Sequence, residues 1–463
     1  VTVEGDNVRY LNIELREGAT YTGNRIAEVS SFAELINLEK NGIISEIKLK
    51  NPIIIDGEDK ISFYGSNLKK ISMSSDFTWT VNGTEYDALI VNSCPELEMG
   101  YCTIFGTSDK TSKYLIQTDA KTYFYPYGVK LDANGSMNGM KVADAKVFMS
   151  GESSIDVESA DSYALYITAD DTVSSVNLSI EGEINGDIFY ENNYDSEDYP
   201  WSMLQIDGNC IHNGEVITAG DNIQDLRIHL YGEYNGNKKI VADDIQDIQN
   251  VVYNETVDTI VLKNPIVVTE EVSCIFSTEK NRAMQILMDE QFIWKVDEVE
   301  YDALFVNTGE GLNLGNCNLK GSAAASTSEK YLLETTASSL FVYDSILDAD
   351  GEMNGVRVKD SWFSLMDETS VIDVENGNRV AINFSSSADE VAVDVHIQGT
   401  VNGNVTYVGL NSSSNKSDCF EVSYGGKIYG DLNASYKYCR VTYEEGSVVE
   451  GNGWADFVTP SNN

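Results

Sequence analysis

Two oxygen-rich loops of this chain carry residue types that bind calcium. They read LDANGSMNG (131–139) and LDADGEMNG (347–355). Their candidate ligands are Asp132, Asn134, Asp348 and Asp350. Carboxylate and amide oxygens suit Ca²⁺, but a loop of the EF-hand type also needs further acidic positions and a bidentate glutamate, which neither loop aligns. A turn explains every residue of both loops, because Asn-Gly and Asp-Gly adopt positive φ at little cost. We favour turns and keep calcium as the alternative; no other cofactor is expected.

A second group of residues could bind carbohydrate. The segment YENNYDSEDYPW (190–201) mixes aromatic rings with acids and amides, a composition that suits stacking on sugar rings. The candidate rings are Tyr190, Tyr194, Tyr199 and Trp201. The similar position later in the chain reads YVGLNSSSNKSDCF (407–420) and is polar instead. The difference indicates either a functional loop or drift without constraint.

The residues that could catalyse a reaction do not form a recognisable set. Asp170 and Asp171 are paired carboxylates, but such pairs in turns are usually solvated. His212 is expected in a turn, and His229 and His396 in strands that pack or face solvent. The sequence has no Ser-His-Asp elbow, phosphate loop or CxxC pair, and a total of three histidines argues against a zinc site. Seven cysteines leave at least one thiol unpaired within a single chain. We therefore predict that the protein is not an enzyme.

The elements that position these residues come from a duplication. IKLKNPIII (47–55) returns as IVLKNPIVV (260–268), and EYDALIVN (85–92) returns as EYDALFVN (300–307). Within each half, similar segments recur every 23 to 28 residues and contain short runs rich in Val, Ile, Tyr and Thr. Asn, Gly, Asp and Ser separate the runs, which is typical of strands joined by turns. Short strands at this period predict a solenoid of parallel coils, about eight in each half.

Each half begins with a short amphipathic helix, which we expect to cover the open end of the coils. SSFAELINLEKNG (30–42) has Ser31 and Glu34 as a capping box, and DIQDIQNVV (244–252) has Asp244 as N-cap. A helix followed by EIKLKNPI (46–53) and by coils of roughly 25 residues resembles the right-handed parallel β-helix of the pectate-lyase-like superfamily. Bacterial adhesins and other surface proteins use the same scaffold. Enzymes with this fold pair acidic clusters with basic motifs, and this chain has no Arg-x-Pro-x-x-Arg pattern.

The predicted fold class is therefore all-β, with two tandem right-handed parallel β-helix (β-solenoid) domains, each opened by a capping helix. We place the first domain at 1–236 and the second at 237–463. The scaffold supports unrelated functions, so the fold alone does not indicate what the protein binds.

Charge and hydropathy exclude some partners. Lys and Arg number 31 against 74 Asp and Glu, a net charge of −43, which repels nucleic acid and anionic membrane surfaces. No run of 18 apolar residues exists, so we expect no membrane insertion. The expected function is a non-enzymatic extracellular structural or adhesive protein at a cell surface, with its signal peptide removed. The alternatives are a glycan-binding or polysaccharide-cleaving protein, and a rigid spacer within a longer surface protein.

Self-association is also expected, because the strand at 8–18 precedes the first capping helix without a coil of its own. It could extend the last coil (430–453) of another copy head-to-tail and build a surface layer, sheath or filament. A glycan or a host or cell-surface component is the other expected partner.

Overall fold

The computed structural model describes most of the chain, and the described residues form two compact units, residues 1–238 and 239–463. Each unit is considered by itself. The described residues are 2–3, 25–39, 41, 44–57, 59–63, 69–119, 121–170, 176–193, 202–206, 210–220, 226–230, 233–234, 236, 238–252, 257–276, 283–324, 329–387, 392–409, 418–423, 425–434 and 439–454.

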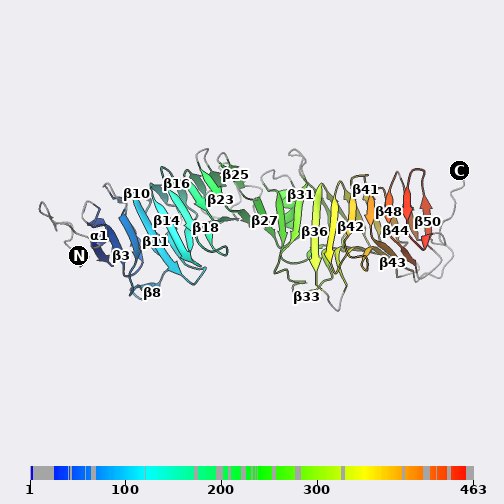
Figure 1. The fold of residues 1–463 in the computed structure, drawn as a ribbon, viewed down its shortest axis with the longest axis horizontal. Coiled ribbons are helices and arrows are strands. Elements are labelled where there is room, and N and C mark those ends of the chain that lie inside the picture. The colour runs from blue at the N-terminus through cyan, green and yellow to red at the C-terminus, as the bar shows by residue number, and fades with distance from the viewer. Residues whose placement is uncertain are drawn as a thin grey trace. The chain divides into compact units, whose positions relative to one another are not determined.

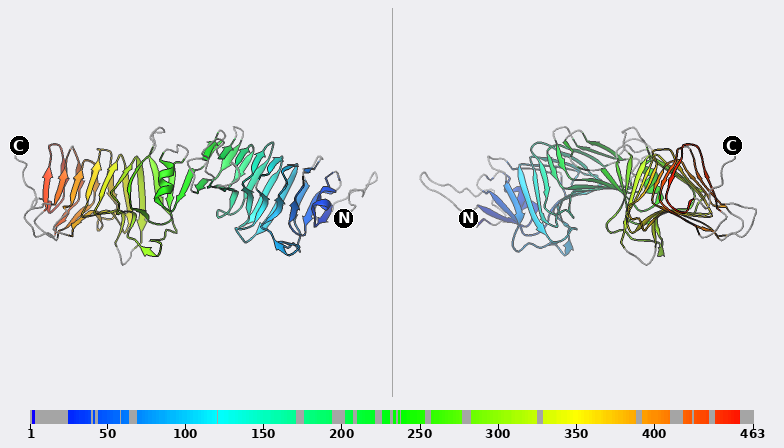
Figure 2. Two further views of the ribbon diagram at one scale, coloured as in Figure 1. Left: turned by 180° about the vertical axis from the view of Figure 1, so that it is seen from behind. Right: turned by 45° about the vertical axis from the view of Figure 1, so that its right-hand side comes forward.

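Each unit is a right-handed parallel β-solenoid (Figures 1 and 2). Successive strands enter three different sheets in turn, and the fourth strand pairs in parallel with the first. The prediction of an all-β, parallel solenoid fold is confirmed. No helix in the described part of the chain is long and apolar enough to cross a membrane.

The first unit contains three stacks of strands. One comprises β1 (Thr2–Val3), β2 (Ile26–Val29), β3 (Glu46–Leu49), β6 (Lys69–Met73), β11 (Cys102–Ser108), β14 (Lys130–Gly135), β17 (Ser154–Val157), β20 (Glu183–Asn185), β23 (Ile211–Asn213) and β26 (Glu233–Tyr234). The second comprises β5 (Asp59–Ser62), β10 (Glu96–Gly100), β13 (Tyr123–Tyr127), β16 (Lys146–Met149), β19 (Asn177–Ile180), β22 (Ser202–Ile206) and β25 (Leu226–Leu230). The third comprises β4 (Ile53–Ile55), β9 (Ala88–Asn92), β12 (Tyr114–Thr118), β15 (Asn138–Ala143), β18 (Tyr163–Ala169), β21 (Asp187–Asn192) and β24 (Val216–Ala219).

The second unit repeats the arrangement. One stack comprises β27 (Lys238–Ala242), β28 (Thr259–Leu262), β31 (Met284–Met288), β36 (Cys317–Ala323), β39 (Ile346–Gly351), β42 (Val371–Val374), β45 (Thr400–Asn402), β48 (Lys427–Tyr429) and β51 (Val448–Glu450). The next comprises β29 (Ile266–Val268), β34 (Ala303–Asn307), β37 (Lys330–Thr336), β40 (Met353–Lys359), β43 (Val380–Ser386), β46 (Asn404–Gly409) and β49 (Leu432–Ala434). The last comprises β30 (Glu271–Ile275), β35 (Gly311–Gly315), β38 (Ser339–Tyr343), β41 (Trp362–Met366), β44 (Asp394–Ile397), β47 (Cys419–Val422) and β50 (Arg440–Tyr443).

Among the described residues, fewer complete coils are found than the sequence suggests. About eight coils per half are expected, but two of the three stacks in each unit have seven strands, while the third has ten in the first unit and nine in the second. In the first unit, the described part of residues 42–88 contains β3 and one further set of three strands, β4–β5–β6. Between β6 and β9 lies an antiparallel hairpin of β7 (Thr80–Val81) and β8 (Thr84–Glu85). The second unit has the same insertion in β32 (Lys295–Val296) and β33 (Val299–Glu300).

The core consists of ladders of aliphatic side chains that point inward from successive coils. One ladder of the first unit contains Ile47, Ile71, Ile104, Leu131, Ile155 and Ile184. Each is buried, and the alternate residues of the same strands face outward. The period of two therefore sends apolar residues into the coil and leaves three outer faces whose side chains are free to diverge.

Helices α1 and α2 begin where the sequence predicts, but each is shorter than the predicted segment, 30–42 or 244–252. In α1 (Phe32–Ile36), the Ser31 hydroxyl accepts from the Glu34 amide at 3.3 Å, and Leu35 is buried. In α2 (Ile245–Val251), Asp244 and Asp247 form a capping box. The first backbone amides of a helix have no carbonyl partner within the helix, and in both helices a side chain at the N-cap accepts from them instead.

Candidate functional site

The two oxygen-rich loops are coil corners. Gly135 and Gly351, at the ends of β14 and β39, have φ of +66° and +63°, the backbone conformation that a turn at these positions needs. In the first loop the Asn134 amide donates to the Asp132 carboxylate at 2.7 Å.

In the second loop the candidate ligands Asp348 and Asp350 are bridged by the ammonium group of Lys320, at 3.0 and 2.8 Å. These hydrogen bonds, first to Asp350 and then to Asp348, raise the pKa of Lys320. Within the described ranges, no group of three or more His, Cys, Asp or Glu side chains is placed to hold a metal ion. A lysine therefore takes the place between these carboxylates that a cation would need.

The second Asn-Gly pair of each loop does not form the next bend. Asn138 and Gly139 begin strand β15, and the side-chain carbonyl of Asn138 accepts from the Tyr163 amide of the next coil at 2.7 Å. Asn354 makes the same contact with the Val380 amide at 2.9 Å. The asparagine links neighbouring coils at the start of a strand, which explains why both halves keep it.

The candidate catalytic residues are not brought together. The Asp170 amide donates to the Asp144 carboxylate at 2.7 Å, and Asp171 lies outside the described residues. His212 was expected in a turn, but it lies in β23 and points into the core. His229 and His396 lie in strands β25 and β44, as predicted.

Of the candidate rings in the aromatic segment 190–201, the structure describes Tyr190 alone. Tyr190 is fully buried, with 0% of its surface exposed, and its hydroxyl donates to the Val176 carbonyl at 3.5 Å. Burial raises the pKa of Tyr190. Its ring has no face open to a ligand, because it belongs to the inward row of β21. Tyr194, Tyr199 and Trp201 lie outside the described residues.

A different set of aromatic residues gathers on the outer face of the β5–β25 stack. Strand β13 reads YFYPY, and the alternation turns Tyr123, Tyr125 and Tyr127 outward while Phe124 and Pro126 face the core. Phe148 from β16 and Tyr101, just after β10, join them. We call these residues the tyrosine face: Tyr101, Tyr123, Tyr125, Tyr127 and Phe148.

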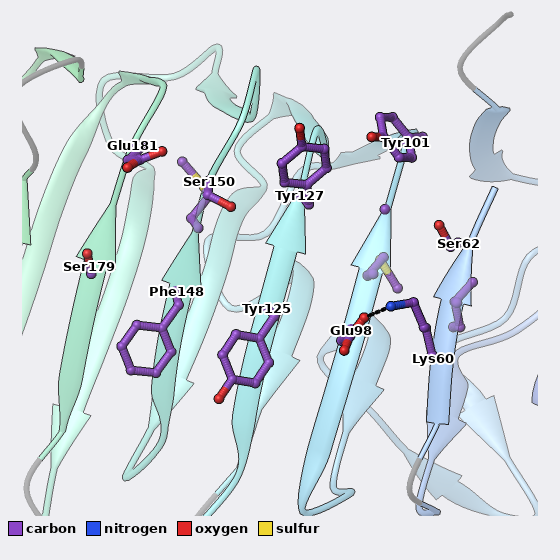
Figure 3. Close-up of a pocket in the computed structure, with 14 residues that line it drawn as sticks. Lys60, Ser62, Glu98, Tyr101, Tyr125, Tyr127, Phe148, Ser150, Ser179 and Glu181 are labelled. Atoms are coloured by element: carbon purple, nitrogen blue, oxygen red, sulfur yellow. Dashed lines mark hydrogen bonds and ion pairs between the residues drawn. The ribbon is translucent and has the colours of Figure 1, made fainter. Parts of the chain in front are cut away.

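The rings of the tyrosine face contact one another in two ways. Tyr125 is stacked on Phe148, with centroids 5.4 Å apart and planes 16° apart, and on Tyr123 at 6.4 Å. Tyr101 and Tyr127 meet edge to face at 5.3 Å. Figure 3 shows Tyr125 and Phe148 side by side on neighbouring strands, with Tyr101 and Tyr127 near the ends of theirs. The stacked rings of Tyr123, Tyr125 and Phe148 form a flat surface, and the edge-to-face pair of Tyr101 and Tyr127 stands beside it.

Polar groups surround these rings in a groove of about 520 Å³. Lys60 and Glu98 form an ion pair at one end, and Ser179 and Glu181 lie at the other (Figure 3). Burial is the main cause that raises the pKa of Tyr125, and the charges of Glu96 and Tyr123 add to it. The Tyr125 hydroxyl is therefore a neutral donor at physiological pH. The groove thus offers apolar ring faces with hydrogen-bonding groups at their edges.

Pro126 explains why strand pairing is interrupted beside the groove. Pairing of β13 with β16 covers Tyr123 and Phe124 and resumes only as a bridge from Tyr127 to Ser150. Proline has no backbone N–H to donate to a ladder. The equivalent strands β38 and β41, with valine at this position, pair continuously from Ser339 to Tyr343. The interruption is therefore local to the first unit.

Tyr101 has an unusual backbone conformation. Its φ is +57°, in the left-handed region that costs roughly 1–2 kcal/mol for ordinary residues. The equivalent corner of the second unit has the same φ of +57° but carries Asn316, a residue that tolerates this region. The two corners make the same hydrogen bond, from the amide of Tyr101 to the Tyr127 carbonyl and from Asn316 to the Tyr343 carbonyl, both at 3.0 Å. The fold does not require tyrosine here, which indicates that its ring has another role.

These features allow a particular kind of recognition. Ring faces pack on the C–H faces of a sugar, while carboxylates, hydroxyls and an ammonium group at the edges exchange hydrogen bonds with its hydroxyls. The sequence contains the alternating tyrosines of YFYPY, a pattern that identifies the site once the outward register of the strand is known. Comparisons with protein-family models, curated proteins and solved structures found no match to this chain.

Proposed function

We propose that this protein is a non-enzymatic, adhesive β-solenoid that binds a neutral polysaccharide on its tyrosine face, in an extracellular or cell-surface setting. The observation that carries the proposal is Tyr101. Its ring is 41% exposed, it contacts Tyr127 at the edge of the groove, and it is held there by a backbone conformation that disfavours tyrosine.

The charge of the protein supports a neutral ligand. The net charge is −43, and Glu98 and Glu181 line the groove itself. A polymer of uronic acids or a sulfated glycan would be repelled by this field, and so would nucleic acid. A neutral chain of sugars has no such cost, and its hydroxyls match the mixture of donors and acceptors around the rings.

The spacing of the rings supports a polymer that runs along the axis of the solenoid. Tyr125 and Phe148 stand on successive coils, which are about 4.8 Å apart in a parallel sheet. This separation is close to the length of one pyranose unit in an extended chain. Successive sugars can therefore meet successive coils, with Glu98 before the rings and Ser179 after them.

We assign the protein no catalytic role, because Asp170, the described member of the acid pair, does not line the groove of the tyrosine face. Head-to-tail assembly into a layer, sheath or filament remains a prediction, since residues 8–18 lie outside the described residues. An adhesive role needs only that the scaffold present this face to its ligand.

Binding is tested by isothermal titration of the full chain with a panel of neutral hexaoses: cellohexaose, xylohexaose, mannohexaose and N-acetylchitohexaose. We expect one of them to bind and Tyr125→Ala to weaken its binding at the tyrosine face by at least about tenfold, because the variant removes the centre of the stack. Tyr429→Ala, an exposed tyrosine on β48, is the matched control and should bind as the wild type does.

Chromatography of the titrated sugars should show no shortened products. The proposal fails if no neutral hexaose binds, or if Tyr125→Ala, like the control Tyr429→Ala, binds with the same affinity and the same number of sites as the wild type. Turnover of the bound hexaose would replace the adhesive role with an enzymatic one.

A further inference from the structure

The equivalent sheet of the second unit carries another exposed aromatic patch. Phe341 and Tyr343 project outward from β38, Trp362 from β41 and His396 from β44, three strands that are hydrogen-bonded neighbours. We call these residues the tryptophan face: Phe341, Tyr343, Trp362 and His396. The Trp362 ring is 48% exposed, so an indole that could have been buried is presented to solvent.

Trp362 lies at the centre of this patch. Its ring centroid is 5.7 Å from that of Phe341 and 5.8 Å from that of His396, and Phe341 is stacked on Tyr343 at 6.5 Å. The rings thus cross three successive coils. At about 4.8 Å per coil, the row has the dimensions of a short run of sugars along the axis of this unit.

The polar groups of the patch are fixed in place. The Nε2 atom of His396 is 3.1 Å from a carboxylate oxygen of Asp394, and its Nδ1 atom is 3.7 Å from one of Glu421. The hydrogen bond to Asp394 is the main reason that the pKa of His396 is raised. The imidazole therefore lies beside the indole with a carboxylate near each of its ring nitrogens, and these groups are the ones a sugar hydroxyl would meet here.

This patch is not a simple remnant of the duplication. Phe341 and Tyr343 correspond to Tyr125 and Tyr127, but Trp362 stands where the first unit has Lys146. The position of Phe148 is occupied by Ser364. Rings are lost at the positions of Tyr101, Tyr123 and Phe148, where the second unit has Asn316, Ser339 and Ser364. Rings are gained at Trp362 and at His396, which stands where the first unit has Ser179. The aromatic character of the face has been retained while its positions changed.

We infer that the tryptophan face is a second carbohydrate-binding site, which takes a neutral polysaccharide and is built differently from the tyrosine face. The ligand class rests on the proposed function. The flanking Asp394 and Glu421 and the net charge of −43 disfavour anionic sugars here as well. Each unit then carries a carbohydrate-binding site of its own.

The test uses the full chain labelled with 5-fluorotryptophan, whose five tryptophans give separate fluorine resonances. Trp362→Phe identifies the resonance of Trp362. Each hexaose of the panel is titrated into the wild type, into Tyr125→Ala and into Trp362→Ala. We expect the Trp362 resonance to shift in the wild type and equally in Tyr125→Ala, and the calorimetric stoichiometry to fall from two sites to one in either variant. Tyr429→Ala should keep both sites.

The outcomes separate the two proposals. Loss of all binding in Tyr125→Ala, with a Trp362 resonance that never shifts, overturns the second site and leaves the first. Binding that survives Tyr125→Ala unchanged at a single site and disappears in Trp362→Ala overturns the tyrosine face and supports the tryptophan face. If no hexaose binds the wild-type chain, both are overturned.

Discussion

His212 occupies an inner position in a ladder that is otherwise aliphatic. It follows Ile184 in register, is fully buried, and its Nε2 atom lies 3.1 Å from the Gly186 carbonyl. Burial lowers the pKa of His212, because the charged imidazolium is disfavoured away from water. The second unit has Ile428 at the equivalent position, also fully buried.

His212→Ile tests this assignment through the pH dependence of stability. The folded pKa is lowered, so the unfolded chain binds more protons as the pH falls through about 6.5. The wild type therefore loses stability in that range, and the variant, without the imidazole, loses less. Urea unfolding at about pH 7.5 and about pH 5.5 should show a difference between the two proteins that grows toward acid. An equal acid loss in both would mean that His212 is not buried as a neutral group.

Gly139 shows how closely the coils approach one another. A Cβ atom at this position would lie 2.4 Å from the Ala164 carbonyl oxygen of the next coil, and at Gly355 2.3 Å from that of Ala381. Backbone carbonyls of a paired strand cannot move aside without breaking the ladder. The restriction therefore comes from coil spacing, at a place where the sequence alone predicts only a bend.

Gly139→Ala should lower the free energy of unfolding by about 1–3 kcal/mol, the usual cost of overpacking. Gly377→Ala is the matched control, because a Cβ atom added there would meet no other atom within 4 Å, and it should change stability by less than about 0.5 kcal/mol. Chemical denaturation measures both. Equal stabilities would contradict the close approach of the coils at Gly139.

The hairpins are the elements that sequence reasoning missed. Each is anchored by a buried lysine from the following coil. Lys113 is 2% exposed and donates to the Tyr86 carbonyl at 3.1 Å and to the Asp87 carboxylate at 2.8 Å, with the Trp79 ring 4.8 Å away. Lys330 makes the same contacts with Tyr301, Asp302 and Trp294 in the second unit.

Lys113→Met should release the first hairpin without unfolding the coils. We expect a loss of about 1–2 kcal/mol, mainly from the bond to the Tyr86 carbonyl and the packing on Trp79, since exposed carboxylates contribute little. Hydrogen exchange of the Tyr86 amide, which bonds the Trp79 carbonyl, should accelerate. Lys330→Met should act on the second hairpin alone, and the exposed Lys110→Met on neither. Unchanged exchange in Lys113→Met would show that the hairpin does not depend on the lysine.

The coils themselves could be predicted because they depend on local patterns. Alternating runs such as SIDVE (154–158) and its counterpart VIDVE (371–375) show which residues point inward, and their recurrence shows that the strands stack. The helix starts were readable from their caps. The hairpins were not predicted, although Asn82 and Gly83 form the residue pair typical of a two-residue hairpin turn and have φ of +50° and +83°. The repeat pattern favoured another coil here, and the packing of Lys113 shows that this segment leaves the coil.

For the whole molecule, a duplicated scaffold carries surfaces that have diverged. Its candidate site could not be predicted, because Tyr125 and Phe148 become neighbours only when coil follows coil. The composition of segment 190–201 predicted a carbohydrate-binding loop, yet its Tyr190 faces the core. The register of a strand decides which of its side chains are exposed, and the aromatic composition of a segment does not reveal that register.

The central claim is that Tyr101 is kept for its ring rather than for the fold, and Tyr101→Asn tests it most directly. The variant places asparagine at this corner, as the second unit does with Asn316. Two quantities are measured: the free energy of unfolding in urea, and the affinity for the hexaose that binds the wild type. We predict stability that is unchanged or up to about 1 kcal/mol higher, together with an affinity at least about tenfold lower. The reverse substitution, Asn316→Tyr, should cost about 1 kcal/mol of stability. A Tyr101→Asn protein that binds the sugar like the wild type, or that is less stable than it, would contradict the account.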